Sequence, residues 1–197
     1  MNRRIKMLGL FAGAALCGAA AQAELATGDA APEFTLKDST GKEHSLSSYQ
    51  GKHVVLEWIN YACPSVEKNY DNGNMQKLQK DYGWKENVVW LAVCSSAPET
   101  EGNFSAEEIN AMNHQKGFSA HAYLIDEDGA AAKAYGAKTT PHMFVIDPEG
   151  KLVYEGAVDG ATDADAGNYI SACLDACLKG EAPAVTTTDP RGCDIKS

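Results

Sequence analysis

Two long apolar runs constrain the fold of this chain most. Residues 53–60 read HVVLEWIN and residues 87–96 read NVVWLAVCSS, and each run is apolar almost without interruption. A strand with one exposed face alternates apolar and polar residues, whereas a near-continuous apolar run is typical of a strand that is covered on both faces. The chain therefore predicts a central sheet with helices packed on both sides.

The remaining segments alternate between strand and helix patterns. We expect short strands on either side of Gly41, a helix over 64–81 that is broken near 72–73, a helix over 106–116, strands over 121–126, 142–147 and 151–156, a short helix over 128–136 and a last helix over 163–178. This order indicates an α/β sandwich with a mixed sheet. No Gly-x-Gly-x-x-Gly or Walker sequence follows a strand, so we expect no nucleotide cofactor.

The first residues have the layout of a cleaved secretory signal. Basic residues Arg3, Arg4 and Lys6 precede an apolar run over 7–21, and small residues surround a cleavage point after residue 23. A retained membrane anchor is the alternative, but the run is short for a spanning helix. We expect residues 1–23 to be a signal peptide, residues 24–180 to be one domain, and residues 181–197 to be a C-terminal tail. Export across an inner membrane to a bacterial periplasm is the corresponding location.

Charge and cysteine content limit the partners. Loss of three basic residues with the signal would change the formal net charge from -10 to -13. Such a surface disfavours nucleic acid and anionic membrane, so we expect neither as a partner after signal removal. Of the six cysteines, only Cys17 lies in the signal. The five that remain are an odd number, so at least one thiol is free, intermolecular or cycling.

The dipeptide Cys63-Pro64 follows the first apolar run. Proline suits the first position of a helix, which places Cys63 at a helix N-terminus. Unpaired backbone amides and the helix dipole favour a thiolate there, so the sequence predicts a reactive cysteine. A buried structural cysteine is the alternative.

Glu57 interrupts the same apolar run. A carboxylate is costly to bury unless it is protonated or paired. If Glu57 lies beneath Cys63, desolvation would raise the pKa of its carboxyl group and let it move a proton to or from a thiol. An edge position with a solvated carboxylate is an equally good interpretation.

Two stretches resemble the thioredoxin-fold superfamily, in its branch of exported redoxins and AhpC/TSA-type peroxiredoxin-like proteins. They are WINYACPSV (58–66) and YGAKTTPHMFVIDPEGKLVYEGAVDG (135–160), and the likeness extends over residues 28–197, most closely to a subgroup with a single active-site cysteine. The resemblance implies a three-layer sandwich with a central mixed sheet and an N-terminal strand extension. It also implies that Cys63 is the nucleophile, that Thr140-Pro141 is a cis-proline segment that contacts substrate together with Pro64, and that Glu57 is the buried acid.

The chain departs from these families at the positions that complete their chemistry. Val66 stands where a Cys-x-x-Cys motif has its second cysteine, and Leu56 and Asn60 stand where peroxiredoxins have the proline and threonine of their peroxide site. After the signal the chain has a single arginine, Arg191. Standard peroxidase chemistry is therefore poorly supported.

A second thiol must resolve the intermediate that Cys63 forms. Cys193, in a tail that we expect to be flexible, is the first candidate, and Cys94 at the end of the second apolar run is the next. Cys173 and Cys177 share a face of the last helix, where burial is the default. The remaining alternative is a structural disulfide between Cys193 and either Cys173 or Cys177.

These observations predict an exported thiol oxidoreductase. Cys63 would attack a disulfide or peroxide in a protein or small molecule, Glu57 would move a proton, Cys193 would resolve the product, and an external thiol would restore the reduced form. The alternative is a non-catalytic redoxin module that binds a partner protein or a soft metal such as copper. His142 could then join a metal, or its charge could favour the thiolate, but the histidine spacing predicts no metal site.

Overall fold

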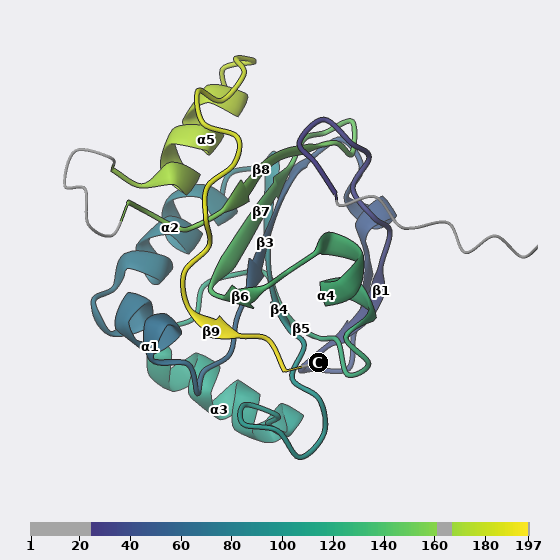
Figure 1. The fold of residues 1–197 in the computed structure, drawn as a ribbon, viewed down its shortest axis with the longest axis vertical. Coiled ribbons are helices and arrows are strands. Elements are labelled where there is room, and N and C mark those ends of the chain that lie inside the picture. Colours follow the sequence, from purple (N-terminus) through teal and green to yellow (C-terminus); the bar gives the residue numbers. More distant parts are fainter. Residues whose placement is uncertain (1–24, 161–166, 197) are drawn as a thin grey trace, which may run out of the picture.

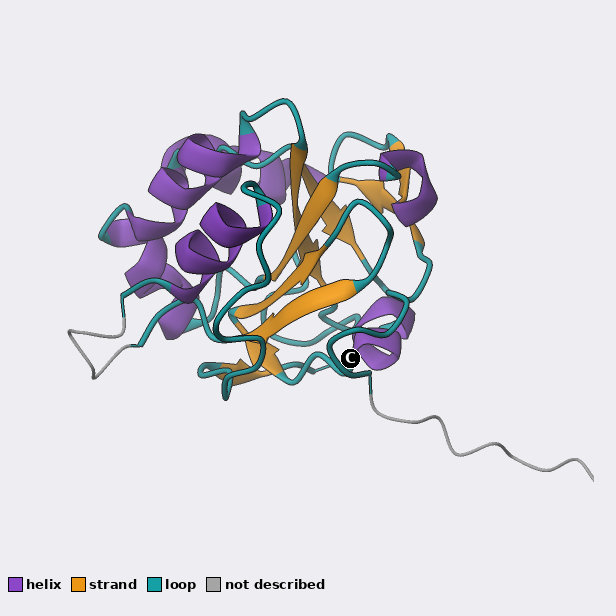
Figure 2. Cartoon of the chain, turned by 90° about the horizontal axis from the view of Figure 1, so that it is seen from above, coloured by secondary structure: helices purple, strands orange, loops and turns teal. Residues whose placement is uncertain are grey.

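The computed structural model describes residues 25–160 and 167–196, and it forms a three-layer α/β/α sandwich (Figures 1 and 2). The strands are β1 (Thr35–Asp38), β2 (Glu43–Ser45), β3 (His53–Trp58), β4 (Val88–Cys94), β5 (Ala122–Ile125), β6 (Thr139–Thr140), β7 (His142–Ile146), β8 (Leu152–Gly156) and β9 (Cys193–Asp194). The helices are α1 (Pro64–Asp71), α2 (Asn74–Gly83), α3 (Ala106–Lys116), α4 (Ala130–Tyr135) and α5 (Tyr169–Cys177), with a 3-10 turn at Leu46–Tyr49. The expected signal peptide lies outside the described residues.

The central sheet has the strand order β2-β1-β5-β4-β3-β7-β8. Strand β4 pairs in parallel with β3 and β5, while β7, β8, β1 and β2 join by antiparallel pairing. Every residue of β3, β4 and β7 is buried. The expectation of a mixed sheet built on covered apolar strands is confirmed, and so is the thioredoxin-like fold class.

Alternate residues of β3 enter two separate cores. Val55 and Ile59 pack with side chains from α1, α2 and α5. Val54, Leu56 and Trp58 pack on the other side with α4 and the segment that precedes β1. Figure 2 shows the sheet between these two layers. Because β3 is central and covered on both faces, the position of its carboxyl end is rigidly defined.

The predicted break in the first helical segment is confirmed at Gly73. This residue has φ 77° and separates α1 from α2. The predicted capping box is also present, since Ser105 and Glu108 exchange hydrogen bonds at the start of α3. Within the described residues the last helix begins at Tyr169, because the side chain of Asn168 accepts a hydrogen bond from the backbone N–H of Ser171 and caps the helix there. Residues 163–166 of the predicted helix lie outside the described residues.

The C-terminal tail folds back along the sheet and pairs with it at two places. Thr186 and Thr188 exchange backbone hydrogen bonds with Glu155 at the edge of β8. Farther along, β9 pairs antiparallel with β6, with Cys193 opposite Thr140. The yellow ribbon in Figure 1 follows this path from α5 down to β9. Within the described residues, no helix is long and apolar enough to cross a bilayer.

Two glycines of the α1–α2 region provide a matched stability test. Gly73 has the left-handed backbone that disfavours a side chain, although the space around it is open. Gly73→Ala should lower the free energy of unfolding by about 1 kcal/mol. Gly83 lies within α2, and a methyl group there would meet Trp90 at ordinary contact distance, so Gly83→Ala should be neutral or stabilising. Urea unfolding measures both, and equal losses in the two variants would contradict the conformational explanation.

Candidate active site

Cys63 lies at the junction of the central strand and the first helix. It is the N-cap residue of α1, and Pro64 occupies the first helical turn. The Cys63 N–H donates to the carbonyl oxygen of Asn60 (2.9 Å), and the Cys63 carbonyl accepts from the N–H of Glu67 (2.9 Å). The structure thus places the sulfur at the positive end of a helix, which stabilises a thiolate electrostatically.

A disulfide joins Cys63 to Cys193, which is 130 residues away in the sequence. The two Cα atoms are 5.9 Å apart, within the usual range for such a bond. Cys63 is only 2% exposed, whereas Cys193 is partly exposed. The tail therefore supplies the second cysteine that a Cys-x-x-Cys motif would have at position 66. Val66 itself is buried in the core.

The cis peptide bond before Pro141 completes this arrangement, as the resemblance implied. The carbonyl oxygen of Thr140 lies 3.0 Å from the sulfur of Cys63, and Thr140 also faces Cys193 across the β6–β9 pair. The tail approaches so closely that a Cβ atom built on Gly192 would overlap the Thr140 carbonyl. Cys63, Pro64, Thr140, Pro141 and Cys193 are thus brought together.

Glu57 is in the interior, not at an edge. The side chain is 1% exposed and points to the same side of β3 as Val55 and Ile59. Its carboxylate accepts hydrogen bonds from the hydroxyl of Tyr70 (2.9 Å), the amide of Gln79 (2.9 Å) and the indole N–H of Trp90 (2.8 Å). Burial raises the pKa of this carboxyl group, and the three donors oppose the rise. None of these three bonds joins the carboxylate to Cys63, so its part in proton movement stays a prediction.

The other three cysteines among the described residues form no disulfide. Cys94 is buried, with its sulfur 3.4 Å from the Ser96 hydroxyl, so it does not pair with Cys63 in this state. Cys173 is buried and Cys177 is partly exposed, and the two thiols interact with each other. The alternative in which the tail is bound to α5 through Cys173 or Cys177 is wrong, because Cys193 pairs with Cys63.

His142 does not supply the expected charge. It is buried, packs against the ring of Phe144, and accepts a hydrogen bond from the backbone N–H of Lys138. Burial, with a smaller contribution from the charge of Lys138, lowers the pKa of the imidazole to about 4, so the ring is neutral at physiological pH. Over the part of the chain that the structure describes, no group of three or more His, Cys, Asp or Glu side chains is arranged to hold a metal ion.

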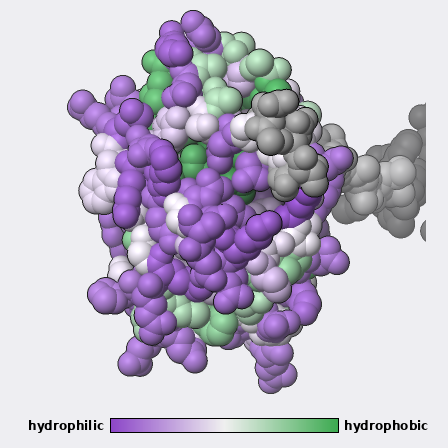
Figure 3. All heavy atoms as spheres, turned by 90° about the vertical axis from the view of Figure 1, so that its left-hand side faces the viewer, coloured by the Kyte–Doolittle hydropathy of each residue, from purple (hydrophilic) through white to green (hydrophobic). Residues whose placement is uncertain are grey.

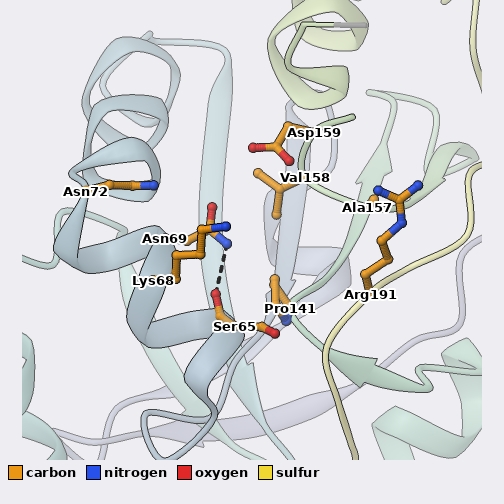
Figure 4. Close-up of a pocket in the computed structure, with 9 residues that line it drawn as sticks. All are labelled: Ser65, Lys68, Asn69, Asn72, Pro141, Ala157, Val158, Asp159 and Arg191. Atoms are coloured by element: carbon orange, nitrogen blue, oxygen red, sulfur yellow. Dashed lines mark hydrogen bonds between the residues drawn. The ribbon is translucent and has the colours of Figure 1, made fainter. Parts of the chain in front are cut away.

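Two cavities beside the disulfide were not predicted. One, of about 300 Å³, lies between α1, Pro141, the segment 157–159 and Arg191. Figure 4 shows Lys68 and Asn69 on its helical wall, Asp159 above, and Arg191 entering from the tail. The second, of about 250 Å³, is lined by both cysteines of the disulfide and by Asn60, Glu101 and Lys196. The position of Arg191, two residues before Cys193, was the one sequence signal for the first cavity. The residues that face Arg191 could not be predicted, because they depend on the path of the tail across the fold.

The surface around α1 and α2 is mostly polar. Hydrophilic side chains dominate the face shown in Figure 3, which is the left side of Figure 1. The cavity beside Pro141 is lined by charged side chains of both signs, from Lys68, Arg191 and Asp159. The neighbourhood of the disulfide is thus suited to a polar, extended ligand more than to a large apolar one.

Comparison with known proteins agrees with this geometry. The AhpC/TSA family model matches residues 27–155. The chain belongs to the AhpC/TSA family. The matched segment contains Glu57, Cys63 and Pro141, and it ends before the tail that carries Cys193.

Individual relatives point to thiol chemistry. The chain is 31% identical over 128 residues to thiol-disulfide oxidoreductase ResA of Geobacillus thermodenitrificans, covering 65% of this chain and 67% of that protein. It is 27% identical over 146 residues to a thiol peroxidase of Staphylococcus saprophyticus, covering 71% and 82%. The crystal structure of an uncharacterized conserved protein from Geobacillus kaustophilus superposes with a TM-score of 0.78 at 27% identity, over 89% of this chain and 94% of that one. The expectation of a thioredoxin-fold oxidoreductase enzyme is confirmed at this level.

The buried acid gives a pH-dependent prediction. Because the pKa of Glu57 is raised in the folded protein, the folded state keeps a proton that the unfolded chain releases near pH 4.5. The contribution of Glu57 to the free energy of unfolding should therefore fall as pH rises from there, by about 1.4 kcal/mol for each pH unit until the folded carboxyl ionises. Glu57→Gln should lack this fall, so its stability relative to wild type should increase with pH.

Urea unfolding at several pH values measures this difference. Glu67→Gln, which removes an exposed carboxylate from α1, is the control variant. A stability difference between Glu57→Gln and wild type that is the same at every pH would contradict the raised pKa.

The free thiols should differ in reactivity. The thiol of Cys173 donates to Cys177 and, with a smaller contribution from His53, lowers the pKa of Cys177 below that of an ordinary thiol. Cys177 is also more exposed than Cys94 or Cys173. In the oxidised protein, Cys177 should be alkylated by iodoacetamide first, with a rate that rises at a pH below that of an ordinary thiol. Peptide mapping by mass spectrometry checks the order, and faster labelling of Cys94 would contradict it.

Proposed function

We propose that this protein is an exported thiol-disulfide oxidoreductase that cycles between a dithiol and the Cys63–Cys193 disulfide. The observation that carries the proposal is this bond itself, formed between the N-cap residue of α1 and a tail strand paired with Thr140. A resolving thiol in direct reach of the nucleophile turns a one-cysteine motif into a two-cysteine cycle.

In the first half of the cycle, the Cys63 thiolate attacks one sulfur of a substrate disulfide. A mixed disulfide forms between Cys63 and the substrate, and the other substrate sulfur leaves as a thiolate that takes up a proton. The thiol of Cys193 then loses its proton and attacks the sulfur of Cys63. The second substrate thiol leaves, so that the substrate has gained two electrons and two protons and the enzyme holds the Cys63–Cys193 bond.

In the second half, an external thiol reduces the enzyme. Cys193 is the more exposed partner and lines the cavity of about 250 Å³ at the disulfide. Attack on the Cys193 sulfur expels Cys63 as the leaving thiolate, which the N-terminus of α1 stabilises, and a thiolate of lower pKa leaves faster. A second equivalent of the external thiol releases Cys193 and leaves the external thiol as a disulfide.

Peroxide is a second candidate oxidant, favoured by the likeness to a thiol peroxidase. The residues around Cys63 support it less well. Leu56 is buried in the core, and the amide of Asn60 is already bound to the Ala62 N–H and the Glu101 carbonyl. Neither side chain offers the hydrogen bonds that a departing peroxide oxygen needs. Two observations support the proposal of export: residues 1–23 have the pattern of a secretory signal, and an oxidising compartment would preserve the disulfide.

Single-cysteine variants test this cycle. The reduced proteins are mixed with a disulfide-bonded peptide and an excess of a small thiol, and peptide thiol is measured over time. Cys63→Ser should lose turnover to the uncatalysed level. Cys193→Ser, mixed with the peptide but without the small thiol, should react once and accumulate the mixed disulfide at Cys63, visible by intact mass spectrometry. Cys94→Ser is the matched control and should cycle like wild type.

The outcome separates the candidates. Turnover that survives in Cys63→Ser, or is unchanged in Cys193→Ser, would overturn the proposal. If hydrogen peroxide forms the Cys63–Cys193 bond faster than the peptide disulfide does, peroxide reduction replaces disulfide exchange as the favoured function. Stable capture of the peptide by Cys63→Ser, without turnover in wild type, would favour the binding-module alternative.

A further inference from the structure

The tail occupies a backbone edge in the manner of a bound peptide. Strand β6 is only two residues long, and its partner in the structure is β9. The pairing places Cys193 opposite Thr140 and Asp194 opposite Thr139, and the Ile195 N–H donates to the Lys138 carbonyl (3.1 Å). A strand added in this way is held by main-chain hydrogen bonds, while its side chains determine which sequences fit.

The residue before the tail cysteine has almost no room. At Gly192, a Cβ atom would overlap the carbonyl oxygen of Thr140 and press on the backbone of Pro141. The obstacle is backbone, which is itself fixed between Cys63 and the tail, so it has little freedom to move. Only glycine fits at this position without a shift of one chain relative to the other.

The residue two before the cysteine has a polar cavity beside it. Arg191 forms one wall of the cavity of about 300 Å³, opposite Lys68 and Asn69 of α1 and close to Pro141 (Figure 4). A long polar side chain is therefore accommodated at this position, immediately next to a position that rejects any side chain. Position 192 thus accepts only glycine, whereas position 191 accepts a long polar side chain, and this difference would select among peptide sequences.

We propose that the Thr139–Pro141 edge selects extended polypeptides whose reactive cysteine directly follows a glycine, and that the tail occupies this edge as a built-in ligand of that sequence. The inference rests on the proposed function and deepens it by naming the substrate class. Reduction of the Cys63–Cys193 bond frees the edge from its covalently held occupant, so the site opens to a substrate in the same state in which Cys63 can attack.

The same geometry applies to a substrate because two constraints act together. In the mixed disulfide, the substrate cysteine is bonded to the Cys63 sulfur, as Cys193 is now. Pairing of the substrate main chain with Thr140 fixes its direction, as it does for β9. The residue before the substrate cysteine then faces the Thr140 carbonyl, and a side chain there forces the loss of the strand pairing or a displacement of the sulfur.

Activated peptides test the glycine requirement. Three peptides are compared, each bearing a thionitrobenzoate disulfide on its cysteine. The first has the sequence of residues 188–196, the second has alanine in place of the glycine, and the third has alanine in place of its one threonine. Attack of reduced Cys63 on the peptide sulfur forms the mixed disulfide and expels thionitrobenzoate, whose absorbance is followed. The Cys193 thiol then displaces the peptide as a free thiol.

The unchanged peptide should react about tenfold or more faster than the glycine-to-alanine peptide, which corresponds to loss of about one buried backbone hydrogen bond. The threonine-to-alanine peptide should react like the unchanged one. Rates are divided by those of each peptide with a small free thiol, which removes differences in intrinsic reactivity. Dithiobis(nitrobenzoate), which has no backbone to pair, measures the reactivity of Cys63 alone.

Three results are informative. A selective loss in the glycine-to-alanine peptide supports the site. Equal rates for all peptides, with dithiobis(nitrobenzoate) also reacting, would overturn the glycine requirement while leaving the thiol-disulfide cycle intact. Failure of every disulfide, including dithiobis(nitrobenzoate), to react with Cys63 would overturn both the inference and the function on which it rests.

Discussion

The backbone of Thr140 is the contact on which the candidate site depends. Its carbonyl oxygen lies against the Cys63 sulfur, its main chain pairs with Cys193, and its position excludes a side chain at residue 192. Three parts of the chain that are distant in sequence therefore meet at one peptide unit. The peptide bond from this unit to Pro141 is cis, and the Thr140 carbonyl lies beside the N-cap residue of α1.

The scaffold holds that unit in place through buried strands. Strand β7 follows Pro141 directly and pairs with β3, which ends just before the turn to Cys63. Both strands are buried throughout, so the distance between the nucleophile and Thr140 is set by sheet geometry. Glu57 lies in the same core and uses hydrogen bonds from α1, α2 and β4 to accommodate its carboxylate. Its burial therefore links the pH dependence of stability to the element that presents Cys63.

Local signals in the sequence predicted the scaffold well. Continuous apolar runs identified β3 and β4, Pro64 identified the start of α1, and Gly73 identified the break after it. The features that were missed depend on contacts between distant segments. Nothing local in the tail reveals that Thr188 pairs with Glu155, and nothing near Arg191 reveals that Lys68 faces it across a cavity. The start of α5 is an intermediate case, because Asn168 is a recognisable cap only once its position before Tyr169 is known.

The long sequence separation of the disulfide has a thermodynamic consequence. A Cys-x-x-Cys bond closes a loop of a few residues and constrains the unfolded chain very little, whereas a bond across 130 residues removes a large share of its conformational freedom. Loop-closure estimates for such lengths are about 5 kcal/mol. Oxidation and folding are thus linked equilibria: the folded chain resists reduction in proportion to the stability that the bond confers on it. Reduction of the Cys63–Cys193 bond is therefore less favourable in the folded chain than in the unfolded chain, by the same free energy that the bond adds to folding.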